Sequence, residues 1–118
     1  MVRVLVLHEV LHEAKEMEHY ISACYKECCV TLCVDASKKE ISEIIEKESV
    51  DVCFTLVRLK RISGIQIAQK LRKKNAKVKI VFVSDTDEYA LDAWRSGVSD
   101  YLLRPITMEK IQKTITNI

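Results

Sequence analysis

The chain has 118 residues, of which 48% are hydrophobic and 31% are charged, and these totals suit one compact soluble domain over residues 1–118. A formal net charge of +2 is too small to indicate binding to nucleic acid or to a membrane. No apolar run reaches the roughly 18 residues that a membrane span needs, and the amino terminus lacks the long apolar stretch of a signal peptide. We therefore expect a cytoplasmic protein.

In chain order, the sequence begins with a continuous apolar run at residues 4–7, which predicts a strand covered on both faces. Apolar side chains then recur at helical spacing over residues 10–24, with charged residues between them. A second apolar run at residues 29–34 predicts the next strand. Ser37 and Glu40 have the spacing of a capping box, which predicts the start of a second helix.

The third expected strand covers residues 52–57, and Ser63 with Gly64 is expected to open the helix that follows it. The apolar face of this helix is expected to comprise Ile65, Ala68 and Leu71. Cations surround the helix: Arg58, Lys60, Arg61, Lys70, Arg72, Lys73, Lys74, Lys77 and Lys79. Contact with a phosphate backbone is one interpretation. Because no aromatic residues are interleaved and positive charge is favourable at a helix end, we favour a solvated face.

The fourth expected strand covers residues 78–83. Asp85 and Glu88 are expected to cap the helix that follows it, which carries Leu91 and should stop near Gly97.

The fifth expected strand is residues 101–103, and Pro105 interrupts the chain after it. Thr107 is expected to cap the last helix. We expect Leu91, on the preceding helix, and Ile111, on this one, to lie in the core.

Five strands that alternate with five helices through short loops predict a doubly wound α/β domain with a parallel sheet. In such folds the working crevice lies at the carboxyl ends of the strands. The residues expected there are His8, Glu9, Asp35, the segment 56–58, Ser84, Asp85, Arg104 and Pro105.

Several kinds of chemistry fit this crevice poorly. No glycine follows the first strand, which argues against a dinucleotide site or a P-loop. Ser84 with His8 could be proposed as a hydrolase pair, but no nucleophile elbow supports it. His8, Glu9 and His12 could be proposed as metal ligands, but no further ligand can be identified. We favour a partly exposed histidine pair at a helix entrance.

The five cysteines are Cys24, Cys28, Cys29, Cys33 and Cys53. Their odd number and apolar neighbours favour reduced, packed thiols. A zinc site is the alternative, but such sites draw on pairs of ligands held on one turn, whereas this run crosses from a helix end into a strand.

The order of elements and one long segment, VDVCFTLVRLKRISGIQIAQKLRKKNAKVKIVFVSDTDEYALDAWRSGVSDYLLRPI, resemble the receiver domains of bacterial response regulators. The part DEYALDAWRSGVSDYLLRPI most resembles receivers that precede LytTR-type DNA-binding domains. The resemblance covers essentially the whole chain and implies a flavodoxin-like (βα)5 fold with strand order 2-1-3-4-5.

The family's phosphorylation site implies five positions in this chain. An acidic pair and the phosphoacceptor aspartate, which together hold Mg²⁺ in the family, correspond to His8, Glu9 and Leu56. The family's hydroxyl after the fourth strand is kept as Ser84, and its lysine is replaced by Arg104. Because leucine has no oxygen to phosphorylate, we expect a degenerate site that is not catalytic, with Mg²⁺ binding weak or absent and no other cofactor. We expect Arg104 to pair with Glu9 or Asp85.

The resemblance also implies the parts that signal. Tyr101 matches an aromatic residue that changes rotamer on activation, and the bond before Pro105 is often cis in the family. The expected signalling surface comprises Tyr89, Trp94, Arg95, Tyr101, Pro105, Met108 and Lys110.

We expect a pseudo-receiver that acts, independently of phosphorylation, on a protein partner or on itself as a weak homodimer. Nucleic acid would be bound only through an output domain outside this sequence. The alternative is a sensor that binds a small molecule or anion in the vacated pocket.

Overall fold

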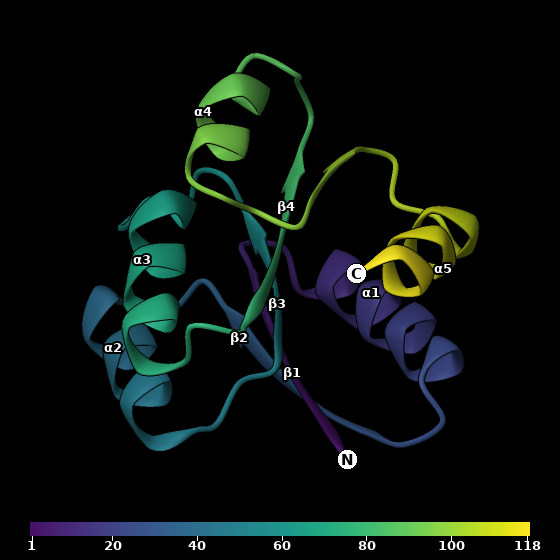
Figure 1. The fold of residues 1–118 in the computed structure, drawn as a ribbon, viewed down its shortest axis with the longest axis horizontal. Helices are drawn as coiled ribbons and strands as arrows, with labels where there is room; N and C mark the ends of the chain where they lie inside the picture. Colours follow the sequence, from purple (N-terminus) through teal and green to yellow (C-terminus); the bar gives the residue numbers. More distant parts are fainter.

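The computed structural model describes residues 1–118 and contains one five-stranded sheet in the order β2-β1-β3-β4-β5 (Figure 1). All the strand pairs are parallel, which confirms the predicted doubly wound α/β architecture and its strand order. The strands are β1 Val2–His8, β2 Cys28–Val34, β3 Val52–Leu56, β4 Lys79–Ser84 and β5 Asp100–Leu103. The helices are α1 Leu11–Cys24, α2 Lys38–Lys47, α3 Gly64–Lys74, α4 Ala90–Arg95 and α5 Met108–Asn117.

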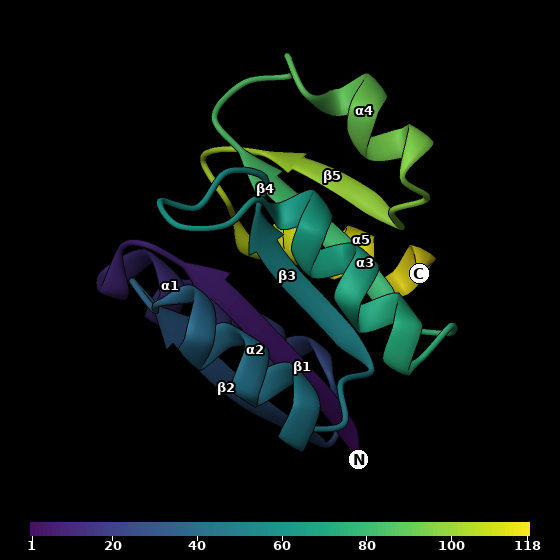
Figure 2. The ribbon, with the colours of Figure 1, turned by 90° about the vertical axis from the view of Figure 1, so that its left-hand side faces the viewer.

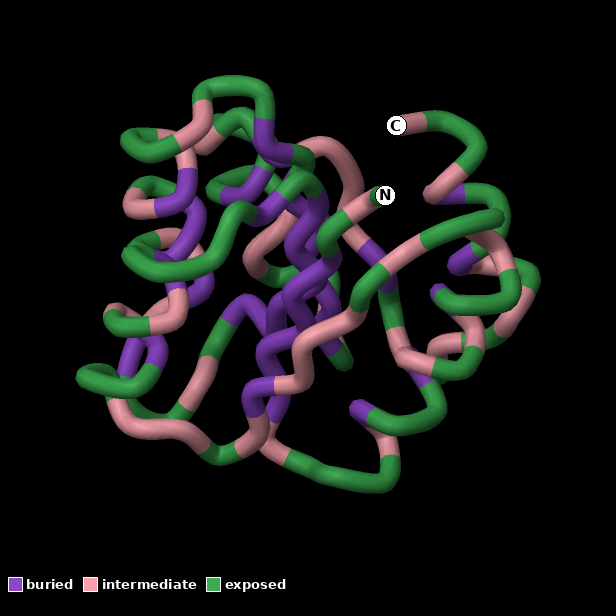
Figure 3. The backbone as a smooth tube through the Cα atoms, turned by 90° about the horizontal axis from the view of Figure 1, so that it is seen from below, coloured by how far each residue is buried: buried purple, intermediate pink, exposed green.

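Helices cover both faces of the sheet. Figure 1 shows α2, α3 and α4 on one side and α1 with α5 on the other. The strands run between these layers, and the central strands β1, β3 and β4 are the most continuously buried part of the chain (Figure 3). On β1, Leu5 and Leu7 belong to the core under α2 and α3, whereas Val4 and Val6 belong to the core under α1 and α5. This alternation follows from the two-residue period of a strand, and burial on both faces explains the unbroken apolar runs in the sequence.

Three of the predicted helix caps are confirmed. Ser37 and Glu40 form the capping box of α2. The Ser63 hydroxyl accepts from the Gln66 amide at the start of α3, and the Thr107 hydroxyl accepts from the Lys110 amide at the start of α5. These local signals depend on a few adjacent residues, which is why the sequence predicts them well.

The predicted cap of α4 is wrong. Asp85 and Glu88 do not cap this helix, which begins only at Ala90, after Tyr89. The Ser84 and Thr86 hydroxyls instead accept hydrogen bonds from backbone amides two residues ahead, at 3.2 and 3.1 Å. Local side-chain bonds of this kind hold the chain in turns and delay the start of the helix.

The short α4 also changes the core. Leu91 was expected in the core but is 61% exposed, whereas Ile111 is fully buried as expected. Ala93 is the residue of α4 that packs against the sheet. On α3, Ala68 and Leu71 are buried as expected, whereas Ile65 is only partly buried and the fully buried Ile67 was not predicted.

Two cations of α3 bind the ends of neighbouring helices. The Lys74 ammonium donates to the carbonyls of Ile45, Glu46 and Glu48 at 2.8, 2.5 and 2.8 Å. The Arg72 guanidinium donates to the carbonyls of Ser96 and Gly97 beyond α4. Unpaired carbonyls carry partial negative charge at the C-terminal end of a helix. Each cation therefore stabilises the end of a neighbouring helix as well as the C-terminal end of α3, where it lies.

Candidate functional site

The five positions that the resemblance assigns to a phosphorylation site meet at the carboxyl ends of β1, β3, β4 and β5. Glu9, Leu56, Ser84 and Arg104 line one open depression of about 480 Å³, and His8 lies beside Arg104. Parallel strands end at the same edge of the sheet, which brings together residues that are far apart in sequence. Figure 2 shows this edge, where the loops after the strands gather.

His8 ends β1 and is only 2% exposed. Its Nδ1 accepts hydrogen bonds from the backbone amides of Glu9 and Val10, at 2.9 and 3.0 Å. Because an accepting ring nitrogen carries no proton, a neutral His8 holds its proton on Nε2. Burial lowers the pKa of His8, the Arg104 charge lowers it further, and Glu13 acts in the opposite direction. His8 is therefore a neutral, buried part of the structure.

Arg104 pairs with Glu13, not with Glu9 or Asp85 as expected. One guanidinium nitrogen lies 3.4 Å from Glu13 Oε2 and 3.5 Å from His8 Nε2. Because α1 begins at Leu11, Glu13 falls in its first turn and faces the loop after β5. Sequence reasoning missed Glu13, whose only signal was its place four residues beyond the predicted acidic pair. The bond between Arg104 and Pro105 is cis, as the resemblance implied.

Glu9 is directed to the loop between β3 and α3. Its Oε1 accepts a 2.7 Å hydrogen bond from the Lys60 amide, and its Oε2 is buried without a hydrogen-bond partner. Asp35, at the end of β2, holds the same loop through Arg61 at 3.0 Å and Lys60 at 3.6 Å. The hydrogen bond from Arg61 is the main cause of the lowered pKa of Asp35. Two carboxylates thus fix this loop.

Leu56 occupies the end of β3, at 8% exposure, within the apolar cluster under α1 and α5. The preceding residue, Thr55, is buried and bonds its hydroxyl to the Leu56 carbonyl at 3.0 Å. A Cβ on Gly64 would lie 2.5 Å from the same carbonyl oxygen, so only glycine allows α3 to start this close to the strand. The start of α3 therefore packs directly against the backbone at the end of β3.

Hydrogen bonds hold the loop between β4 and α4 in place. The Ser84 hydroxyl accepts from the Thr86 amide at 3.2 Å, and the Tyr101 hydroxyl donates to the Thr86 carbonyl at 2.7 Å. Arg58 donates to the Tyr89 hydroxyl at 2.7 Å and lies 5.5 Å from the centre of its ring. Ser84, Tyr101 and Tyr89 are thus engaged inside the protein.

The expected signalling surface is only partly exposed. Trp94, Arg95 and Pro105 are exposed. The Lys110 ammonium instead donates to the carbonyls of Leu103 and Pro105 at 2.8 and 2.9 Å. Met108 faces α1, where its sulfur lies 3.9 Å from the Cys24 thiol. Exposed Leu91 and Leu103 enlarge the apolar part of this surface, and sequence reasoning missed both as surface residues.

The cysteines are all unpaired, with Cys33 and Cys53 buried and Cys29 exposed. Burial raises the pKa of the Cys33 and Cys53 thiols. Cys29 is therefore exposed, contrary to the expectation that all five thiols are packed. None of the helices combines the length and the hydropathy that a membrane-spanning segment requires.

Comparison with known proteins gives a consistent result. The family model described as the response regulator receiver domain matches residues 10–116. An uncharacterized response regulatory protein of Yersinia pestis is 32% identical over 124 residues, covering 100% of this chain and 48% of the relative. A LytR sensory transduction protein of Staphylococcus haemolyticus is 31% identical over 83 residues, covering 68% of this chain and 32% of the relative. The chain thus spans about half or less of these relatives.

Solved structures agree on the fold. The response regulatory domain of MrkE from Klebsiella pneumoniae superposes with a TM-score of 0.85 at 19% identity, covering 98% of this chain and 93% of that chain. A two-component response regulator from Clostridium difficile gives a TM-score of 0.82 at 19% identity, over 98% and 93% of the two chains. The fold, the position of the crevice and the matching family model lead to one conclusion: this chain belongs to the response regulator receiver domains and is a domain of signal transduction.

Proposed function

We propose that this receiver is a pseudo-receiver, a non-enzymatic signalling module that takes no phosphoryl group and works through protein contacts. The observation that carries the proposal is Leu56, which fills the position of the phosphoacceptor with a packed apolar side chain. Aspartyl phosphorylation needs a carboxylate nucleophile in line with the donor. Leucine provides no nucleophile.

The surrounding donors do not fit Mg²⁺, the ion that the family uses. Mg²⁺ prefers several oxygen ligands in octahedral order. The Nδ1 of His8 already accepts hydrogen bonds from two backbone amides, and its Nε2 faces the Arg104 cation, so neither nitrogen is available to a metal ion. Glu9 is the one carboxylate left of the family's three, and one of its oxygens already binds the Lys60 amide. We therefore propose that the site works without a metal and derive no step through one.

The bonds around Thr86 support an output that needs no phosphoryl group. In the family, the hydroxyl after β4 follows the phosphoryl group and the aromatic residue on β5 responds. Here Ser84 and Tyr101 both bond the backbone of Thr86. We propose that these two bonds hold the loop between β4 and α4 in one conformation and so maintain the surface formed by α4, β5 and α5.

The partner on that surface is proposed to be a protein, with a second copy of this chain as the first candidate. Leu91, Trp94 and Leu103 are exposed there at 61%, 53% and 41%. Exposed apolar residues that cluster on one surface are typical of contact sites. Any binding of nucleic acid would belong to an output domain outside these residues.

The alternative function, a sensor that binds an anion in the depression beside Leu56, is less well supported than the pseudo-receiver. The two arginines of the depression already have partners, Tyr89 for Arg58 and Glu13 for Arg104. Glu9, Asp85 and Glu88 line the same depression and would repel an anion.

The proposal is tested with acetyl phosphate and Mg²⁺, followed by intact-protein mass spectrometry. We expect no phosphate adduct, and we expect beryllofluoride to leave the amide spectrum unchanged. A single adduct with the lability of an acyl phosphate would contradict the proposal.

A further inference from the structure

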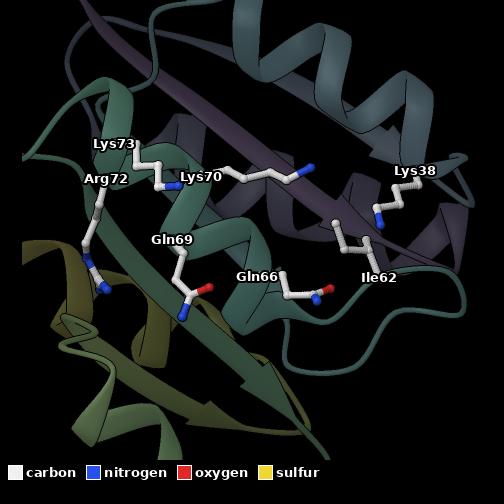
Figure 4. Close-up of a pocket in the computed structure, with 7 residues that line it drawn as sticks. All are labelled: Lys38, Ile62, Gln66, Gln69, Lys70, Arg72 and Lys73. Carbon is white, nitrogen blue, oxygen red and sulfur yellow. The ribbon is translucent and has the colours of Figure 1, made fainter.

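A second feature lies away from the phosphorylation site, on the outer side of α2 and α3. The structure has a groove of about 570 Å³ there (Figure 4). Its polar lining consists of four cations and two glutamines: Lys38, Lys70, Arg72, Lys73, Gln66 and Gln69. Ile62 is the one hydrophobic residue that lines it, and no carboxylate does. The groove therefore combines a high local positive charge with hydrogen-bonding amides.

The cations of the groove are not neutralised by the protein. The lysines and arginines that pair with carboxylates in the structure are Lys60, Arg61 and Arg104, none of which lines the groove. The Arg72 guanidinium donates its hydrogen bonds to the carbonyls beyond α4, which leaves its charge without a carboxylate partner.

The ammonium groups of the groove are freer than this guanidinium. Lys70 makes one hydrogen bond, to the Ser42 hydroxyl at 3.1 Å, and an ammonium has further donors to offer. Lys38 and Lys73 are exposed and make no ion pair.

The groove has the dimensions of a short extended segment. Four polar residues of α3 are spaced three or four positions apart and so lie on one stripe of the helix: Gln66, Gln69, Lys70 and Lys73. From Gln66 to Lys73 the stripe advances by seven residue steps, which at 1.5 Å per step is about 10 Å. An extended peptide covers this length with about three residues, and alternate side chains point the same way.

The side chains favour a peptide over a nucleic acid. A glutamine amide both donates and accepts, so Gln66 and Gln69 match the N–H and C=O groups of a peptide backbone. A phosphate backbone would leave their carbonyl oxygens without a donor. No aromatic residue lines the groove, so it has no platform on which bases could stack.

From these observations we infer that the groove between α2 and α3 binds a short, extended acidic segment of a partner protein. The lysines bind its carboxylates and the glutamines bind its backbone. The inference does not rest on the proposed pseudo-receiver function, because neither Leu56 nor the surface formed by α4, β5 and α5 contributes to the groove.

The test measures binding of a short fluorescent peptide of alternating glutamate and serine to the whole chain. We expect saturable binding that the double variant Lys38→Glu, Lys73→Glu weakens by about tenfold or more, since two favourable charge pairs are lost and the new carboxylates repel the peptide. The matched control is Lys15→Glu, Lys113→Glu, which changes two exposed lysines on α1 and α5 and alters net charge equally. This control should bind like the original chain.

Two further measurements sharpen the result. The amide signals of Gln66 and Gln69 should shift on titration with the peptide. Binding should weaken as the ionic strength rises from about 0.01 M to about 0.15 M, because the Debye length, over which charges attract one another, then falls from about 30 Å to about 8 Å. Absence of binding at low salt, or equal loss in both double variants, would overturn the inference. Tighter binding of an oligothymidylate through the same two lysines would also overturn it, in favour of a nucleic acid.

Discussion

The imidazole Nε2 of His8 lies 3.5 Å from the guanidinium of Arg104, although 96 positions separate the two residues. Glu13 lies beside both, 3.7 Å from His8 and 3.4 Å from Arg104. These contacts join the end of β1 and the first turn of α1 to the loop after β5. The arrangement keeps one negative and one positive charge near a neutral ring.

Stability should fall at mildly acidic pH because of His8. Its pKa is lowered in the folded state, chiefly by burial, so between that pKa and the ordinary value of 6.5 the unfolded chain binds a proton that the folded chain does not. The contribution of His8 is thus fully present above about pH 6.5 and is lost as the pH falls. Protonation of Nδ1 would also abolish its bonds from two backbone amides. Urea unfolding between about pH 7 and about pH 5 measures this loss.

The substitution His8→Asn should make stability less dependent on pH, since an asparagine oxygen can accept from the same amides without titrating. His19→Asn is the matched control, because it removes an exposed histidine from α1 without touching the buried cluster. If His8→Asn kept the full dependence on pH while His19→Asn abolished it, the assignment to His8 would be wrong.

Replacing Leu56→Asp should destabilise the fold without restoring phosphorylation. The carboxylate would enter an apolar cluster at a position that is only 8% exposed, at a cost of roughly 2 kcal/mol or more. Chemical unfolding measures the loss, and acetyl phosphate with mass spectrometry measures the reaction. Leu56→Asn is the control that removes the same packing without adding a charge.

The triple variant His8→Asp, Leu56→Asp, Arg104→Lys tests the same site from the opposite direction. It rebuilds the family's carboxylates and lysine around Glu9 and Ser84, so we expect it to accept a phosphoryl group in the presence of Mg²⁺. A phosphorylated Leu56→Asp single variant would show that His8 and Arg104 do not block the chemistry.

Local patterns were enough to predict most of the fold. Five apolar runs with helical segments between them define the alternating architecture, and Ser37, Ser63 and Thr107 mark helix starts correctly. The start of α4 was missed because Ser84 and Thr86 bond the backbone locally and compete with the helix. Leu91 then fell outside the core.

The candidate site was predictable in its positions but not in its contacts. The motif order places His8, Leu56 and Arg104 after β1, β3 and β5, and the parallel sheet brings these strand ends to one edge. The pairing of Arg104 with Glu13 depends on where α1 begins and how it packs beside α5, which is tertiary information. Likewise, no local pattern shows that Lys74 binds the end of α2.

The thiols should not hold a structural metal. The structure brings no group of three or more cysteine, histidine or acidic side chains into a metal-binding cluster. A chelator should therefore leave the melting temperature unchanged, because no bound metal would contribute folding energy. Stoichiometric zinc in protein purified without added metal would contradict this prediction.

Alkylation should distinguish the individual thiols. Cys29 is exposed and should react first in the folded protein, whereas Cys33 and Cys53 are buried with raised pKa and should react only after unfolding. Peptide mapping after brief treatment with iodoacetamide gives the order. Early labelling of Cys53 would show that the core opens more readily than its packing indicates.

The exposed residues of α4 should mediate a weak symmetric dimer. Leu91 and Trp94 lie three positions apart on α4 and are 61% and 53% exposed, and a twofold contact uses the same patch on both copies. Sedimentation over a wide concentration range should show reversible association that Trp94→Glu abolishes, because the new charge would be desolvated or repelled at the contact. Leu11→Glu is the matched control, since Leu11 is also 53% exposed but lies at the start of α1. A monomer at every concentration, or association lost only in Leu11→Glu, would rule out this surface as the dimer contact.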